Sequence, residues 1–98
     1  MVKAQIIETL RANEAAIRAV GATALFLFGS AARGEARPDS DVDLFIDYDT
    51  DGDFSIIELI RLRRMIADCL HAEVDLTTRA GLHPVVRDRV IAEAERVF

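Results

Sequence analysis

The sequence predicts a small α/β domain, because its apolar residues fall into two kinds of segment. Three short apolar runs, at 24–28, 42–47 and 74–76, are bounded by polar or glycine-containing stretches and read as strands. Around them lie longer segments in which apolar residues recur at helical spacing. Strands interleaved with helices are typical of a sheet that helices pack against. We therefore expect a short, mixed, three-stranded sheet with about four helices.

The first helix is expected over residues 2–20. Ile6, Leu10 and Ile17 recur near helical spacing, and Gly21 stands where a glycine ends a helix. The run 24–28 follows without alternation, which indicates a strand buried on both faces.

The next elements surround a polar loop. A short helix is expected within 30–34, and Pro38 and Asp39 supply turn chemistry. Strand 42–47 then alternates with a period of two, so Val42, Leu44 and Ile46 are expected on one face of the sheet.

The second half is expected to hold a helix over 53–70, a strand over 74–76, and a last helix that begins near Pro84 and runs to the C-terminus. On the first of these helices, the spacing directs five side chains toward the core: Phe54, Ile57, Ile60, Met65 and either Cys69 or Leu70.

Composition excludes several classes of protein. The formal net charge of −5 disfavours an enzyme that acts on long nucleic acids, which need a basic surface. Cys69 is the only cysteine, so no internal disulfide forms, and a reducing compartment is consistent. With no apolar run near 18 residues and no leader segment, we expect a cytoplasmic protein that does not enter a membrane.

Two neighbouring features carry the chemistry. Asp41 and Asp43 share the face opposite Val42, and two such carboxylates repel each other unless a divalent cation lies between them. Gly29 and Ser30 end the preceding strand, where bare backbone N–H groups suit a phosphate. Together they describe a metal-dependent nucleotide site.

Gly29-Ser30, followed after ten residues by Asp41-Val42-Asp43, resembles the signature of the polymerase β-like nucleotidyltransferase superfamily. The surrounding ARGEARPDSD resembles its smallest branch, the minimal nucleotidyltransferases that pair with HEPN-domain proteins in prokaryotic toxin–antitoxin modules. The resemblance covers almost the whole chain and implies one minimal nucleotidyltransferase domain over residues 1–98.

The resemblance also implies roles for individual residues. A third acid on a later strand completes the site in this superfamily, and the matching position is Asp75, which we expect to be buried between Val74 and Leu76. The implied cofactor is Mg²⁺, as two ions for which Mn²⁺ can substitute. The implied catalytic and metal-binding residues are Asp41, Asp43 and Asp75, and the implied nucleotide-binding residues are Gly29, Ser30 and Arg33.

Simpler roles stay open for several of these residues. Asp41 can serve only as a cap at the start of its strand, Asp75 can be half-exposed, and Arg33 can be a solvated charge. Ser30 is expected to cap the short helix whether or not it binds phosphate.

A calcium-loop pattern competes with this site. Asp47-x-Asp49-x-Asp51-Gly52-x5-Glu58 satisfies the EF-hand consensus, but the loop follows a strand instead of a helix. Acidic residues before a helix also favour its dipole, so we expect no specific calcium binding there.

Three functional hypotheses follow. The first is a Mg²⁺-dependent nucleotidyltransferase that moves AMP from ATP to a hydroxyl of a partner protein, with a HEPN-domain toxin as the implied acceptor. The second is an antitoxin that acts by binding alone. The third, nucleotidylation of a small molecule, is disfavoured because 98 residues leave no room for the acceptor-binding domains of such enzymes.

Overall fold

The computed structural model describes residues 2–37 and 39–98, which form five helices and four strands. The helices are α1 (Lys3–Ala12), α2 (Glu14–Val20), α3 (Gly29–Ala32), α4 (Ile56–Leu70) and α5 (Arg87–Glu93). The strands are β1 (Ala22–Phe28), β2 (Val42–Tyr48), β3 (Val74–Thr78) and β4 (Glu95–Arg96). The predicted α/β class is confirmed, with one more strand than expected and one more helix.

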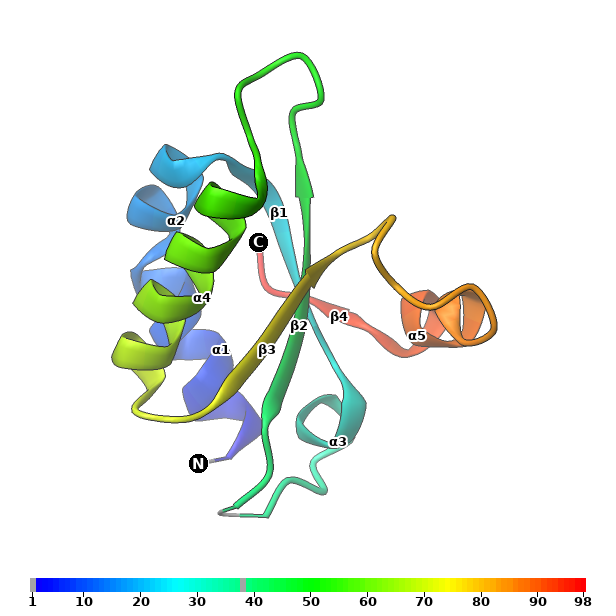
Figure 1. Ribbon diagram of the computed structural model, residues 1–98. Coiled ribbons are helices and arrows are strands. Elements are labelled where there is room, and N and C mark those ends of the chain that lie inside the picture. The colour runs from blue at the N-terminus through cyan, green and yellow to red at the C-terminus, as the bar shows by residue number, and fades with distance from the viewer. Residues whose placement is uncertain (1, 38) are drawn as a thin grey trace.

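The strands form one mixed sheet in the order β3-β2-β1-β4. Strand β1 pairs antiparallel with β2 and with β4, whereas β2 and β3 run parallel. Helices α1, α2 and α4 cover one face of the sheet, and α3 and α5 lie on the other side (Figure 1). The second face is therefore only partly covered.

The core lies between the sheet and the layer formed by α1, α2 and α4. Alternate strand residues point into it, because successive side chains of a strand face opposite ways. The fully buried side chains of this core are Leu25, Leu27, Leu44 and Ile46 from the sheet and Ile6, Leu10, Ile17, Leu62, Ile66 and Leu70 from the helices. No helix in the described residues is long and apolar enough to cross a membrane.

The predicted first helix is two helices. Asn13 ends α1 with φ −106° and ψ 13°, and its side-chain amide donates to the carbonyl of Thr9 at 2.8 Å. Asparagine competes for backbone hydrogen bonds in this way, which disfavours a helix interior. The end of the segment follows the prediction, because Gly21 terminates α2 with φ 135°.

Helix α4 begins later than expected and buries a different stripe. Ser55 caps it, accepting from the N–H of Ile57 at 3.3 Å. The predicted core residues Ile57 and Ile60 are 67% and 45% exposed. The sequence of α4 carries two apolar series, and the one spaced at i, i+4 and i+8, namely Leu62, Ile66 and Leu70, faces the sheet.

The C-terminal segment also differs from the prediction. Pro84 lies in a turn before α5, and the helix ends at Glu93. The chain then extends along β1, where Val97 N–H donates to the carbonyl of Leu25 at 2.8 Å. Pairing of this segment with β1 satisfies the backbone hydrogen-bonding groups at the β1 edge. This stabilisation outweighs the preference of the local sequence for a helix. A turn is predicted at Pro38 and Asp39, and Pro38 lies outside the described residues.

Candidate active site

The strand register brings two of the predicted acids side by side. Asp43 of β2 and Asp75 of β3 are direct partners in the parallel ladder, and Phe28 at the end of β1 pairs with Asp43 from the other side. Because Val42 and Leu44 are buried against the helices, Asp43 points to the opposite, partly open face. We call this face of the sheet the open face.

Asp41 lies immediately before β2 and is exposed. It is close enough to contribute to the electrostatics of Asp43. Burial raises the pKa of the half-buried Asp43 carboxyl, and repulsion from Asp75 and then Asp41 raises this pKa further, while Arg33 lowers it. Asp75 and Asp41 therefore both lie close enough to Asp43 to act on its carboxylate.

Asp75 is exposed, so the prediction of a buried carboxylate is wrong. Strand β3 is an edge strand, and Val74 and Leu76 turn their side chains into the core while Asp75 turns away from it. Within residues 2–37 and 39–98, no three Asp, Glu, His or Cys side chains converge closely enough to form a preassembled metal site. The acids are adjacent without being closed around a common point.

Gly29 brings the backbone against the carboxylate of Asp43. It begins α3 with φ 70°, in the left-handed region that favours glycine, and a Cβ placed on it would collide with Oδ2 of Asp43. The N-cap of α3 is Phe28 and not Ser30, which corrects the expected capping role. Ser30 lies in the first turn of the helix instead, where backbone N–H groups lack helical partners.

An open cleft of about 470 Å³ adjoins Gly29. Its walls come from the end of β1, from Arg33 and from α5, including Arg89. The guanidinium of Arg33 is held by the carboxylates of Glu35 at 3.0 Å and Glu93 at 3.8 Å. The cleft thus holds two arginines and the carboxylate of Glu93 next to the Gly29–Ser30 turn, and Arg33 would have to leave its carboxylate partners to bind an anionic ligand there. Arg89 was missed from the sequence, where nothing marks α5 as a neighbour of β1.

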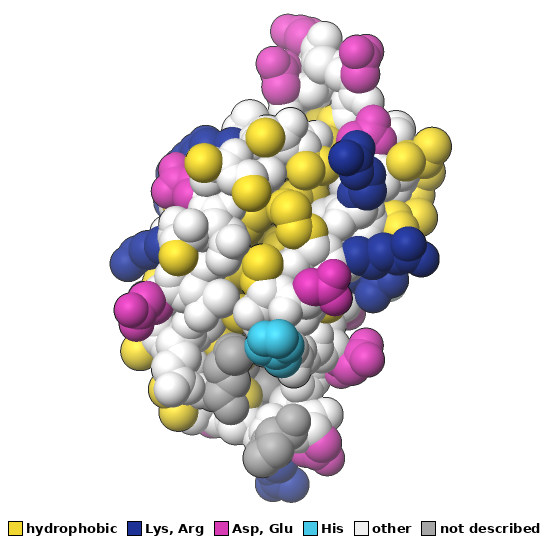
Figure 2. All heavy atoms as spheres, turned by 90° about the vertical axis from the view of Figure 1, so that its left-hand side faces the viewer, with side chains coloured by type: hydrophobic (Ala, Val, Ile, Leu, Met, Phe, Trp, Pro, Cys, Tyr) yellow, Lys and Arg dark blue, Asp and Glu magenta, His cyan; other side chains and the backbone are white. Residues whose placement is uncertain are grey.

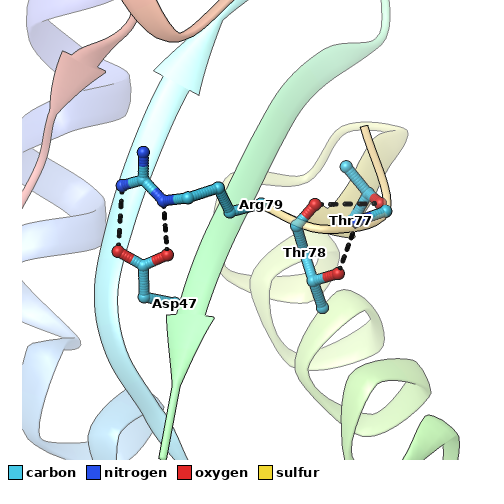
Figure 3. Close-up of polar contacts among 5 residues, drawn as sticks. Asp47, Thr77, Thr78 and Arg79 are labelled. Atoms are coloured by element: carbon cyan, nitrogen blue, oxygen red, sulfur yellow. Dashed lines mark hydrogen bonds and ion pairs between the residues drawn. The ribbon is translucent and has the colours of Figure 1, made fainter. Parts of the chain in front are cut away.

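The open face continues away from the acids over an aromatic surface. The ring of Phe45 is fully buried beneath Phe26 and Phe28. It stacks on the ring of Phe26 with 4.7 Å between ring centroids, and the tilted ring of Phe28 lies 5.8 Å from it. The guanidinium of Arg79 lies over Phe26 and Phe45 and forms a two-pronged ion pair with Asp47, at 2.8 and 3.0 Å (Figure 3). This largely apolar surface borders the acids on the open face. Arg79 too was missed from the sequence.

The loop with the calcium pattern connects β2 to α4, as expected. Its acidic residues Asp49, Asp51 and Asp53 are exposed. Glu58, the residue that would chelate calcium through both oxygens, accepts a hydrogen bond from the Ser55 hydroxyl at 2.7 Å. Glu58 therefore contacts the N-cap residue of α4, and its carboxylate lies in the first turn of the helix, where the dipole favours an acid.

The raised pKa of Asp43 predicts how stability depends on pH without metal. The folded state holds the Asp43 proton more tightly than the unfolded chain, so the stability that this residue contributes falls as pH rises above its ordinary value of 3.8. In EDTA, Asp43→Asn should therefore gain melting temperature relative to the wild type as pH rises from about 4 to 7. Thermal melts across this range measure the gap, and a gap independent of pH would contradict the assignment.

Comparison with known proteins adds a family to this geometry. Residues 4–98 match the family described as Polymerase beta, Nucleotidyltransferase. A Methanocaldococcus jannaschii relative, provisionally named a protein adenylyltransferase, is 35% identical over 72 residues, which are 74% of this chain and 75% of its own length.

Solved structures share the fold. One provisionally described as a minimal nucleotidyltransferase has a TM-score of 0.73 and 36% identity, over 91% of this chain and 93% of that chain. In the complex of tri-AMPylated Shewanella oneidensis HEPN toxin with MNT antitoxin, the matching chain has a TM-score of 0.65 at 17% identity, over 94% of this chain and 71% of that chain. At this low identity the second likeness shows the fold alone.

Proposed function

The chain belongs to the polymerase β-type nucleotidyltransferase family, and on this premise we propose that it transfers AMP from ATP to a hydroxyl group of a partner protein. The observation that carries the proposal is the register of Asp43 beside Asp75, with the backbone of Gly29 against the same carboxylate. A phosphate-binding turn in contact with a carboxylate pair is what transfer of a nucleotidyl group requires.

The donor set fits hard divalent cations, for which Mg²⁺ is the proposed ion and Mn²⁺ a substitute. Asp41, Asp43 and Asp75 offer only carboxylate oxygens, the ligands that such cations prefer. Burial and the repulsion from Asp75 and Asp41 raise the pKa of Asp43 despite the attraction of Arg33, and a bound cation would oppose both effects. Ions held there would neutralise charge on the phosphoryl oxygens and lower the pKa of the attacking hydroxyl.

The residues of the chain have distinct proposed roles in the transfer. Gly29 and Ser30 bind the β- and γ-phosphates through backbone N–H groups, and Arg33 neutralises them from the adjoining cleft. The acceptor oxygen attacks the α-phosphorus, the bond from that phosphorus to the bridging oxygen breaks, and pyrophosphate leaves. Asp75 takes the proton of the acceptor hydroxyl, and its exposure on an edge strand leaves it accessible to an incoming side chain.

A protein acceptor suits the shape of the site. The acids and the aromatic surface beside them lie on the open face, and the cleft that adjoins Gly29 is open to solvent, so an acceptor held there can be part of a docked protein. Orienting a hydroxyl near the α-phosphorus contributes several kcal/mol to catalysis, and a docked partner can supply that orientation. We propose a HEPN-domain toxin as this partner, in keeping with the S. oneidensis complex of that composition.

The test uses the chain alone and together with a HEPN-domain protein. With ATP and Mg²⁺ alone, we expect negligible transfer to the chain itself or to free sugars. Adding the partner should raise the partner's mass by one or more AMP units, as measured by intact mass spectrometry. Efficient modification of a small hydroxylated compound would contradict the proposal.

A variant distinguishes AMP transfer from the alternative, an antitoxin that acts by binding alone. If Asp41→Asn/Asp43→Asn forms the complex and neutralises the toxin as well as the wild type, binding is sufficient and AMP transfer is not the mechanism of protection.

A further inference from the structure

The cleft beside the Gly29 turn has a second wall, which comes from α5. This helix lies on the other side of the sheet from the covering helices (Figure 1). From α5 the cleft is lined by Arg89, Val90 and Glu93, and from the junction of β1 and α3 by Phe28 and Gly29. Its volume of about 470 Å³ is within the range of roughly 300–1,000 Å³ that small-molecule sites occupy. The cleft is therefore large enough for the phosphate chain of a nucleotide.

The two arginines of the cleft are not equally available to a ligand. Arg33 is engaged by the carboxylates of Glu35 and Glu93. In the part of the chain that the structure describes, Arg89 takes part in no ion pair. Glu93 follows Arg89 by four positions, a spacing at which side chains on a helix are neighbours, yet it bonds to Arg33. An anion in the cleft can therefore bind Arg89 without breaking an ion pair, whereas binding to Arg33 competes with two carboxylates.

The position of the cleft decides which part of a nucleotide reaches Arg89. The lining of the cleft includes Gly29 but neither Asp43 nor Asp75, the acids at which the α-phosphorus is proposed to lie. The β- and γ-phosphates are proposed to lie at the Gly29–Ser30 turn, which the cleft adjoins. On the premise of the proposed nucleotidyl transfer, we propose that Arg89 of α5 binds these two outer phosphates and makes the site select a triphosphate over a monophosphate.

The contact gives α5 a role in donor binding that is separate from that of the acids. The bond between the α-phosphorus and the bridging oxygen breaks in the transfer, and pyrophosphate leaves with both phosphates that Arg89 binds. Hydrogen bonds between a guanidinium and phosphate oxygens are charge-assisted and therefore among the stronger ones in proteins. AMP lacks both outer phosphates, so its affinity should not depend on Arg89. A comparison of the two nucleotides thus separates a phosphate contact from a general effect on the fold.

Isothermal titration calorimetry with a nonhydrolysable ATP analogue and with AMP, each in Mg²⁺, tests the contact. Arg89→Gln should weaken binding of the ATP analogue at least about 5-fold and leave the affinity for AMP within about 2-fold of the wild type. Arg89→Glu should weaken binding of the analogue further, because repulsion then replaces attraction. Both variants should melt at the wild-type temperature, since Arg89 is exposed.

The matched controls make the same two changes at Arg64, which is exposed on α4 in the layer that covers the opposite face of the sheet. Figure 2 shows this layer, where basic and acidic side chains are scattered around an apolar centre. At an ionic strength of about 0.15 M, charges on the surface interact over only about 8 Å. Arg64→Gln and Arg64→Glu should therefore bind both nucleotides within about 2-fold of the wild type.

The outcomes separate the role of Arg89 from the proposed function. If the wild type binds the ATP analogue and Arg89→Gln binds it equally well, the role of Arg89 is overturned while the proposed function stands. Equal losses of the analogue and of AMP in Arg89→Gln also overturn the selection of a triphosphate. A wild type that does not bind the analogue in Mg²⁺ overturns both proposals.

Discussion

Replacing Asp41 and Asp43 together by asparagine should reduce AMP transfer to the partner at least about 10³-fold. Metal-borne stabilisation of the phosphoryl transition state is worth several kcal/mol, and each 1.36 kcal/mol is tenfold in rate. The fold should remain intact, because the substitution removes repulsion that raises the pKa of Asp43 without removing a core contact. The measurement is the time course of AMP incorporation by mass spectrometry, with circular dichroism to verify folding.

The matched control is Asp68→Asn, which makes the same change at an exposed position of α4 in the covering layer. It should transfer AMP at the wild-type rate. Metal-dependent binding of an ATP analogue should be lost in the double variant and kept in the control. Full transfer by the double variant would place the site elsewhere on the chain and would refute the proposed chemistry.

The sequence predicted that Gly29 and Asp43 lie close together because the two positions are near each other along the chain. Gly29 and Ser30 follow β1 directly and Asp43 is the second residue of β2, so the antiparallel return of the chain brings them together. The position of Asp75 beside Asp43 could not be predicted from nearby residues. It depends on the parallel register of β2 and β3, which the packing of the connecting helix α4 determines. The exposure of Asp75 could not be read from its apolar neighbours, which point away from it.

Arg79 and Arg89 show the limit of the same reasoning. Both are arginines among other arginines in the sequence, and only the tertiary structure distinguishes them. Arg79 is placed by its ion pair with Asp47, 32 positions away, and Arg89 by the packing of α5 beside β1. Neither contact leaves a periodic signal.

The errors in the predicted fold have a related cause. On α4, the exposed isoleucines at 56, 57 and 60 are as apolar as the buried series Leu62, Ile66 and Leu70. The helical period alone does not say which of the two stripes meets the sheet. Strand β4 comprises two charged residues and forms only because the β1 edge offers unpaired backbone groups. Which stripe of α4 is buried, and whether β4 forms, both depend on contacts with residues that are distant in sequence.

Gly29→Ala should weaken nucleotide binding and destabilise the fold more than the same change at Gly34. The two glycines have φ of 70° and 73°, so alanine at either position costs about 1–2 kcal/mol of backbone strain. They differ in surroundings: a Cβ at Gly34 meets nothing within 4 Å, whereas a Cβ at Gly29 collides with the carboxylate of Asp43. The excess destabilisation at Gly29, at least about 1 kcal/mol, therefore reports on this contact.

A double-mutant cycle makes the assignment specific. In an Asp43→Ala background the carboxylate is absent, so the excess destabilisation of Gly29→Ala over Gly34→Ala should largely disappear. Urea denaturation of the six proteins gives the free energies of unfolding, and titration with an ATP analogue and Mg²⁺ gives nucleotide affinity. Gly34→Ala should bind nucleotide within about 2-fold of the wild type, and Gly29→Ala at least about 10-fold more weakly, because its methyl group occupies the space between the backbone and the carboxylate. Equal destabilisation at the two positions, with nucleotide affinity preserved in both, would show that the Gly29 turn does not cradle the phosphates.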